Sequence, residues 1–273
     1  MATVIFGVLA GVCWAASDFN GGVASKHTPA LAVVVLSQIA GAGLMVIFAL
    51  GEAVPAWPDL LAGGAAGICG SLALVAYYHG LAQGRMGVTS PVTAVIAVIV
   101  PVVVGSFSEG LPAPLRLAGF GLALLSVWLV SRTNSTIYLR ELALPVAAGI
   151  GFGAFLTLLA LASERAVFWP LVAARVASSS VLIPLALATS SLHAERVRLP
   201  LIAVTGLLDA GGNALYALAA QFGRLDIAAV LSSLYPAGTV LLARLILKED
   251  MSRAQWIGLG AALLAIGLIT VGG

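Results

Sequence analysis

Four charged side chains lie inside long apolar segments of this chain: Asp18, Arg175, Asp209 and Arg244. An ionisable group at that depth is costly unless it meets a partner, a ligand or a water-filled cavity. Arg244 lies about a turn from the end of its segment, where a long side chain can reach the membrane interface. Asp18, Arg175 and Asp209 are therefore the first candidates for a binding or coupling site.

Helical spacing places further polar and aromatic residues beside both carboxylates. Trp14 precedes Asp18 by one turn, and Asn213 and Tyr216 follow Asp209 on its face of the helix. Two interpretations stay open for each acid. Asp18 either lines a cavity or reaches interfacial water, and Asp209 either binds substrate or a proton or belongs to a network that holds helices together.

Two interpretations also stay open for Arg175, the only cation deep in an apolar segment. Its guanidinium can pair with Asp209 or Asp18, or it can grip a carboxylate or phosphate of a substrate. Low-polarity surroundings favour a neutral carboxyl, so Asp209 is also a candidate proton carrier.

Three prolines that interrupt apolar segments are candidates for cavity or hinge positions. Pro91, Pro101 and Pro236 each remove a backbone donor, so we expect kinks that line a cavity or serve as hinges. Ser232 precedes Pro236 and suits a cavity wall, although its hydroxyl can equally bond back to its own helix.

The composition shows which solvent surrounds these residues. Of 273 residues, 61% are hydrophobic and only 9% are charged, too few charges to coat a soluble globule. The apolar runs have the length that crosses a bilayer, and they lack the alternation of barrel strands. The sequence predicts an all-α membrane protein with ten transmembrane helices, near 3–24, 30–50, 60–82, 88–107, 116–131, 142–163, 168–190, 200–220, 227–247 and 254–272.

Other kinds of site find little support. The net charge is +2 and the basic residues are scattered, so no nucleic-acid partner is expected. Cys13 and Cys69 form no metal or disulfide motif, and the three histidines are far apart. There is no phosphate-binding loop for ATP. We expect no enzyme activity, no cofactor and no metal.

An internal repeat organises the chain. Gly67, Tyr77, Gly84 and Arg85 recur 139 residues later as Gly206, Tyr216, Gly223 and Arg224, and Glu109 recurs as Glu249. Tyr77 thereby joins Tyr216 as a candidate site residue. We predict two repeats, 1–135 and 136–273. Five spans in each is an odd number, so the second repeat must be inverted in the membrane, an arrangement typical of secondary transporters.

The chain resembles the EamA-type members of the drug/metabolite transporter superfamily. The resemblance rests on "YPAGTVLLARLILKEDMSRAQWIGLGAALLAIGLITVG" from Tyr235, on Pro91, Pro101 and Glu109 in the first half, on Trp14, Phe19 and Lys26, and on Arg175. It departs at Ser37-Gln38, where the family often has an arginine. The resemblance implies a transport fold with a broad substrate class of amino acids, other metabolites or drugs.

The expected function is that of a secondary transporter, and more specifically of an exporter of a small metabolite such as an amino acid. Its central cavity would be walled by spans 1, 3, 4, 6, 8 and 9 and would open to each side in turn. The alternatives are a multidrug efflux transporter for apolar or cationic compounds and, more remotely, a non-transport membrane subunit or a membrane-embedded enzyme. The expected partners are the substrate, the lipid bilayer and a coupling proton.

The expected location is the plasma membrane, and the expected state is a monomer or a weak homodimer. Orientation has two conflicting indications. Eight Lys and Arg residues lie on the side opposite the termini and three on the side of the termini, which by the positive-inside rule places both termini outside. The family resemblance implies termini inside.

Overall fold

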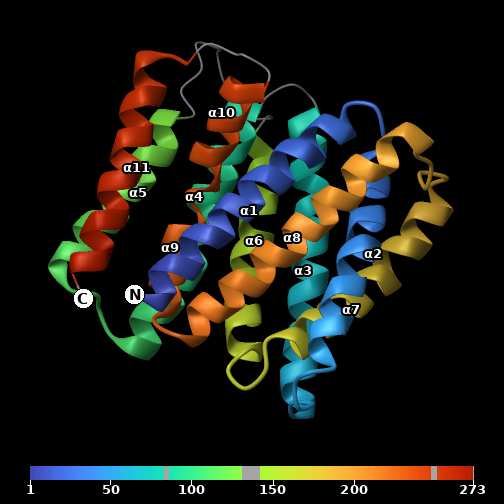
Figure 1. Cartoon of the computed structure of the whole chain (residues 1–273), viewed down its shortest axis with the longest axis horizontal. Helices are drawn as coiled ribbons and strands as arrows, with labels where there is room; N and C mark the ends of the chain where they lie inside the picture. Colours follow the sequence, from blue (N-terminus) through green and yellow to red (C-terminus); the bar gives the residue numbers. More distant parts are fainter. Residues whose placement is uncertain (83–85, 131–141, 247–250, 273) are drawn as a thin grey trace.

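A computed structural model describes residues 1–82, 86–130, 142–246 and 251–272, and its regular elements are all helices (Figure 1). In chain order they are α1 (Ala2–Ser25), α2 (Ala30–Ala49), α3 (Trp57–Ala82), α4 (Met86–Glu109), α5 (Pro114–Val130), α6 (Ala143–Ala162), α7 (Phe168–Ala188), the short 3-10 helix η2 (Arg196–Arg198), α8 (Leu199–Gln221), α9 (Leu225–Ser232), α10 (Tyr235–Ile246) and α11 (Arg253–Val271).

These helices make ten spans in the predicted order. Nine segments of the described chain are long and apolar enough to cross a membrane, one of them formed by α9 and α10 together, and α5 is shorter at 17 residues. The ends of the spans differ from the predicted ones by three residues or fewer. The chain is an integral, multi-pass membrane protein.

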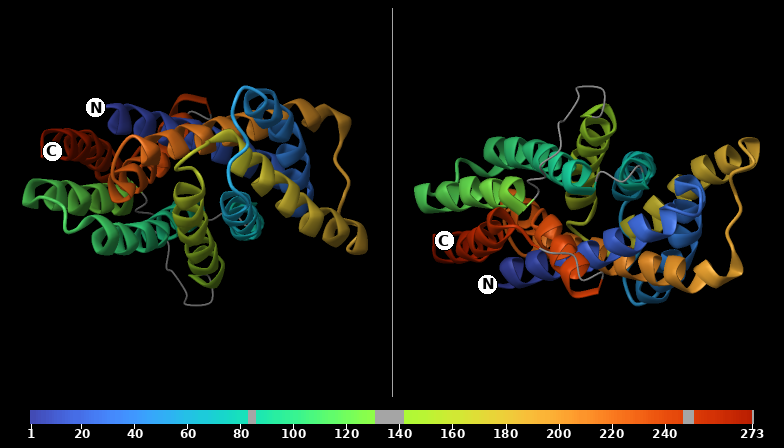
Figure 2. Two further views of the ribbon diagram at one scale, coloured as in Figure 1. Left: turned by 90° about the horizontal axis from the view of Figure 1, so that it is seen from below. Right: turned by 90° about the horizontal axis from the view of Figure 1, so that it is seen from above.

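The helices pack in two layers, which Figure 2 shows one above the other. The first layer consists of α1, α2, α8, α9 and α10, and the second of α3, α4, α6 and α7. Apart from the contact of α5 with α11, the most extensive contacts lie within these sets, above all α1 with α8 and α3 with α6. Helices α5 and α11 pack on each other and form a separate pair beside the layers.

Exchanging the two halves of the chain maps one layer onto the other. The contact of α1 with α8 becomes that of α6 with α3, and the contact of α2 with α8 becomes that of α7 with α3. Each layer therefore takes helices from both halves, so the halves are intertwined. The predicted boundary between residues 135 and 136 lies outside the described residues, as do Gly84, Arg85 and Glu249 of the repeat.

Two glycines related by the repeat set the closest helix approaches near the centre. A side chain on Gly206 of α8 would overlap the carbonyl of Ser37 in α2, and one on Gly67 of α3 would overlap the backbone of Ala174 in α7. Only hydrogen at these positions allows the backbones so near. Gln38 and Arg175 follow the two contact points directly, so both side chains are held near the middle of the molecule.

The ninth span departs from the predicted single helix over 227–247. It breaks at Ser233 and Leu234 into α9 and α10, and Pro236 stands in the first turn of α10. A proline is well tolerated there, because the first N–H groups of a helix have no partner within it. Proline thus starts a new helix here and does not kink a continuous one. Pro91 and Pro101, by contrast, lie within a single helix, α4.

Both termini lie on the same side of the membrane, at the lower left of Figure 1. That side also carries the turns from α4 to α5 and from α8 to α9. It is called the terminal face below, and the other side the opposite face.

Candidate functional site

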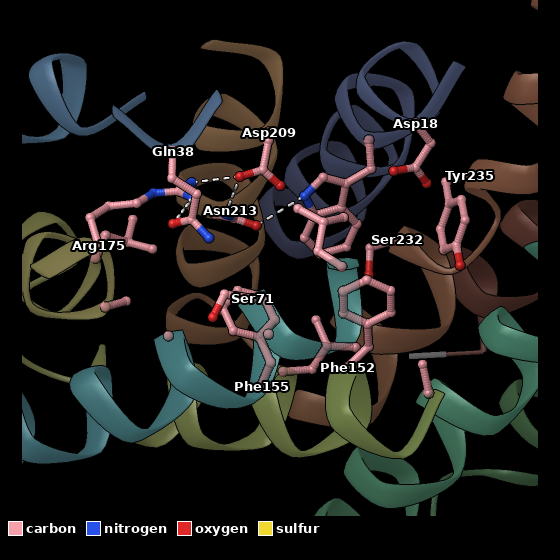
Figure 3. A pocket seen from close by; sticks show the side chains of 18 of the residues that line it. Asp18, Gln38, Ser71, Phe152, Phe155, Arg175, Asp209, Asn213, Ser232 and Tyr235 are labelled. Atoms are coloured by element: carbon pink, nitrogen blue, oxygen red, sulfur yellow. Dashed lines mark hydrogen bonds and ion pairs between the residues drawn. The ribbon is translucent and has the colours of Figure 1, made fainter. Parts of the chain in front are cut away.

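A pocket of about 790 Å³, part of it open to solvent, lies between the two layers (Figure 3). The cavity proper, which is the volume to compare with known binding sites, is about 80 Å³ and is smaller than a typical small-molecule site. Helices of the first layer and its broken span contribute Trp14, Asp18, Gln38, Asp209, Asn213, Ser232, Ser233 and Tyr235, and the second layer contributes Gly67, Gly70, Ser71, Leu74, Ala97, Phe152, Phe155, Leu156, Leu171, Ala174 and Arg175. The predicted walls omitted spans 2 and 7. Both contribute, because the glycine contacts draw them to the centre.

Arg175 reaches across the pocket from α7 to the first layer. Its Nη2 donates to Oδ2 of Asp209 at 2.6 Å, and its Nη1 donates to Oε1 of Gln38 at 2.8 Å. Ser178, one turn further along α7, donates to the same Gln38 oxygen at 2.9 Å. The side chains of Arg175 and Asp209 are 7% and 17% exposed, so this is a buried ion pair rather than a surface one.

Asn213 extends the network along α8. Its Nδ2 donates to Oδ2 of Asp209 at 3.1 Å, and its Oδ1 accepts a hydrogen bond from Nε1 of Trp14 at 3.0 Å. The indole and the carboxylate together leave the amide only one favourable orientation. Four helices, α1, α2, α7 and α8, are thereby joined through polar side chains at mid-membrane.

Asp18 occupies the other end of the pocket. It is 8% exposed and has no ion-pair partner in the part of the chain that the structure describes. Figure 3 shows its carboxylate beside Tyr235, whose hydroxyl is buried and makes no hydrogen bond to the described residues. Asp18 also lies near enough to Asp209 for the two carboxylates to interact electrostatically.

The second layer forms an apolar wall opposite these acids. Phe152, Phe155 and Leu156 of α6 line it together with Leu74 of α3 and Leu171 of α7. Across the pocket, one side therefore offers carboxylates and amides and the other offers rings and aliphatic side chains, with Arg175 the only charge on the second side. Such a surface suits a molecule with one polar end and an apolar body.

The two tyrosines of the repeat lie outside the lining. Tyr77 is fully buried and donates to Oγ of Ser90 at 3.0 Å, and Tyr216 is fully buried and donates to the carbonyl of Leu156 at 3.0 Å. The ring of Tyr216 lies 5.7 Å from that of Trp14. Both tyrosines therefore contact the helices or side chains that form the pocket without facing it.

The structure also shows which of the predicted hinge and cavity residues line the pocket. Ser232 lines the pocket, but its hydroxyl donates back to the carbonyl of Ala229 at 3.1 Å. Pro101 is buried within α4 and Pro236 begins α10, and neither belongs to the lining. The side chain of Pro91 lies outside the described part of the structure.

Several lining residues were not singled out from the sequence. Gln38 is a polar residue in the middle of an apolar span, a signal that could have identified it. The sequence contained no comparable signal for Phe152, Phe155 and Tyr235, since aromatic residues are frequent in membrane helices. Within the described residues, no group of three His, Cys, Asp or Glu side chains is placed to hold a metal ion.

Comparison with known proteins relates part of the chain to a protein family. Residues 140–271 match the model of the EamA-like transporter family. A crystal structure of another protein superposes with a TM-score of 0.79 at 15% sequence identity, covering 98% of this chain and 96% of that one. At that identity the likeness concerns the fold alone. No curated protein matches the chain.

Proposed function

We propose that the chain, whose residues 140–271 match the EamA-like transporter family, is a secondary transporter that carries a small organic amine across the membrane in its central pocket. The choice of an amine rests on the position of Asp18 in the pocket. When all groups are ionised, the lining holds two carboxylates and one guanidinium, and the guanidinium is already paired with Asp209. A cation at Asp18 would balance the charge.

The apolar wall supports the same choice of substrate. Ammonium groups are attracted to carboxylates and to aromatic faces. The lining includes Tyr235, which Figure 3 shows beside Asp18, and Trp14, which precedes Asp18 by one turn of α1. The body of the substrate would then pack against Phe152 and Phe155. Amino acids are metabolites that carry such an ammonium group, and export is the direction we propose.

A multidrug efflux transporter is the second candidate. The aromatic and aliphatic wall favours it, because such a surface accepts apolar cations of varied shape. The carboxylate of an amino acid separates the two candidates. A metabolite carrier should bind that carboxylate through Arg175, whereas a carrier of apolar cations should not need it.

Thermal unfolding of the purified protein with matched ligands tests this proposal. The ligands are an apolar amino acid, the amine formed by its decarboxylation and its N-acetyl derivative. A ligand at 100 times its Kd stabilises the folded state by about 2.7 kcal/mol, so binding raises Tm. We expect both compounds with a free amine to raise Tm and the N-acetyl derivative to have no effect.

The Asp18→Asn variant provides the control for the site. Loss of a charge-assisted hydrogen bond of about 1.5–3 kcal/mol should weaken amine binding about tenfold or more. Equal Tm shifts in the variant and the parent protein, or a larger shift with the N-acetyl derivative, would refute the amine site.

A further inference from the structure

The turn between α8 and α9 is bound to the end of α4 at the terminal face. Arg224 donates Nη1 to the carbonyl of Glu109 at 2.9 Å and Nη2 to the carbonyl of Gly110 at 2.6 Å. The carboxylate of Glu109 in turn accepts the backbone N–H of Leu225 at 3.1 Å, at the start of α9. A turn of the first layer and a helix end of the second layer thus hold each other from both sides.

A buried acid completes this contact. Asp226 is fully buried, and its two oxygens accept Nε of Arg224 at 3.1 Å and Nη2 at 2.8 Å. This hydrogen bonding raises the pKa of Arg224, so the guanidinium stays charged. Behind it, Gly105 of α4 lies so close to Asp226 that a Cβ on Gly105 would be 3.3 Å from Cβ of Asp226. The layers therefore touch directly here.

A second charged contact joins the layers at the same face. Glu52 follows α2, and its carboxylate accepts the backbone N–H groups of Val167 at 3.0 Å and Phe168 at 2.8 Å. These groups lie at the N-terminus of α7, where the helix dipole favours a negative charge. Nε1 of Trp169 adds a hydrogen bond to the Glu52 carbonyl at 3.2 Å.

Near the opposite face, the two halves of the chain meet in contacts of another kind. Ser17 donates to the carbonyl of Thr205 at 3.0 Å within the first layer, and Thr93 donates to the carbonyl of Pro145 at 3.2 Å within the second. These contacts hold the helices of one layer together. The layers also touch near the opposite face, where Gly21 of α1 packs on Tyr78 of α3, but this contact is uncharged. Outside the pocket, the charged contacts described above join the layers at the terminal face, and a movement that opens the pocket there must break them.

From this difference we infer that Glu52, Glu109, Arg224 and Asp226 form a gate, which closes the pocket toward the terminal face and parts when the pocket opens there. The inference rests on the proposed transport function, in which one layer rocks against the other. Charged side chains suit such a gate, because water can solvate each of them at the membrane boundary once they separate.

Thiol labelling tests the gate without any substrate. The background carries Cys13→Ala and Cys69→Ala, and Ser71→Cys places one thiol in the pocket. The C-terminus lies at the terminal face, so protease treatment of a C-terminal tag shows which vesicles expose that face. We expect a membrane-impermeant maleimide, added to that face, to label the Glu109→Gln variant about fivefold faster than the background protein, as expected for an ion pair worth about 1 kcal/mol.

The matched control is Glu195→Gln. Glu195 pairs with Arg198 at 3.2 Å, but both residues lie in the connection before α8 and join no layers. Labelling of this variant should equal that of the background. Unchanged labelling in both Glu109→Gln and Glu52→Gln would overturn the gate.

A reversible crosslink tests the gate if these variants do not fold. Gly105→Cys with Asp226→Cys places two Cβ atoms near the 3.5–4.5 Å of a disulfide, across the layers. Thr3→Cys with Gly223→Cys, at 3.1 Å, is the control within the first layer at the same face. Oxidation should stop transport only in the first pair and leave its Tm shift with ligand intact, and reduction should restore transport.

The outcomes of these experiments remain distinct. If the protein that carries Gly105→Cys and Asp226→Cys transports as fast after oxidation as it does with both thiols reduced, the gate is overturned. If the parent protein transports no amine, the proposed function fails, while the labelling rates still decide whether the gate exists.

Discussion

Arg175 joins the two layers inside the membrane through charged and polar contacts. It extends from the second layer, and its hydrogen bonds end on Asp209 and Gln38 of the first. Separating the layers at this point would leave a guanidinium and a carboxylate without partners in a medium of low polarity. The pair therefore has to move with both layers or exchange its partner for a substrate or water, which is what a binding site at the centre of a transporter requires.

This pair predicts an asymmetry between single and double variants. Asp209→Asn leaves the buried Arg175 charge unpaired and should lower the free energy of unfolding by about 3–5 kcal/mol. Arg175→Met combined with Asp209→Leu removes both charges, and it should recover most of that loss while abolishing ligand binding. Thermal unfolding in detergent, with and without ligand, measures both effects. A double variant less stable than Asp209→Asn would show that the pair is a net contributor to stability.

At the scale of the helices, glycine places the polar residues. Gly206 brings α8 against α2 beside Gln38, and Gly67 brings α3 against α7 beside Arg175. The broken span acts in a different way, because it ends one helix and begins another at the wall of the pocket. The hydroxyls of Ser232 and Ser233 donate to the carbonyls of Ala229 and Val230, groups near the end of α9.

The glycine contact predicts a position-dependent effect within a single helix. Gly206→Ala should lower the stability by about 1–3 kcal/mol, because the new methyl group would overlap the carbonyl of Ser37. Gly211→Ala in the same helix meets no atom within 4 Å, so it should be neutral or stabilising by up to about 1 kcal/mol. The two Tm values, compared with that of the parent protein, check this. Equal values would mean that α8 does not pack closely on α2.

For the whole molecule, the intertwined layers determine how the chain can fold. Helices α1 and α2 pack mainly on α8 of the other half, and α3 packs mainly on α6 and α7. The last helix of each half, α5 or α11, packs on the other. Neither half can complete a layer alone.

We therefore predict that the two repeats fold only together. When residues 1–135 and 136–273 are expressed as separate chains in the same cell, they should copurify and give the ligand-induced Tm shift of the intact protein. Each chain expressed alone should be degraded or aggregate, because its contact surfaces stay exposed. A half that purified alone as a stable monomer would contradict the intertwined arrangement.

The sequence by itself determined the ten spans, the inverted repeat and the candidates Asp18, Arg175 and Asp209. These follow from local hydropathy and from the cost of charge in lipid, which need no knowledge of neighbouring helices. Only the tertiary structure decided that Arg175 pairs with Asp209 while Asp18 has no such partner among the described residues, that Gln38 and the phenylalanines line the pocket, and that Tyr77 and Tyr216 do not. Those outcomes depend on which face each helix turns to the others, and an apolar helix in lipid carries no pattern that reveals this, because its lipid-facing and helix-facing residues are alike.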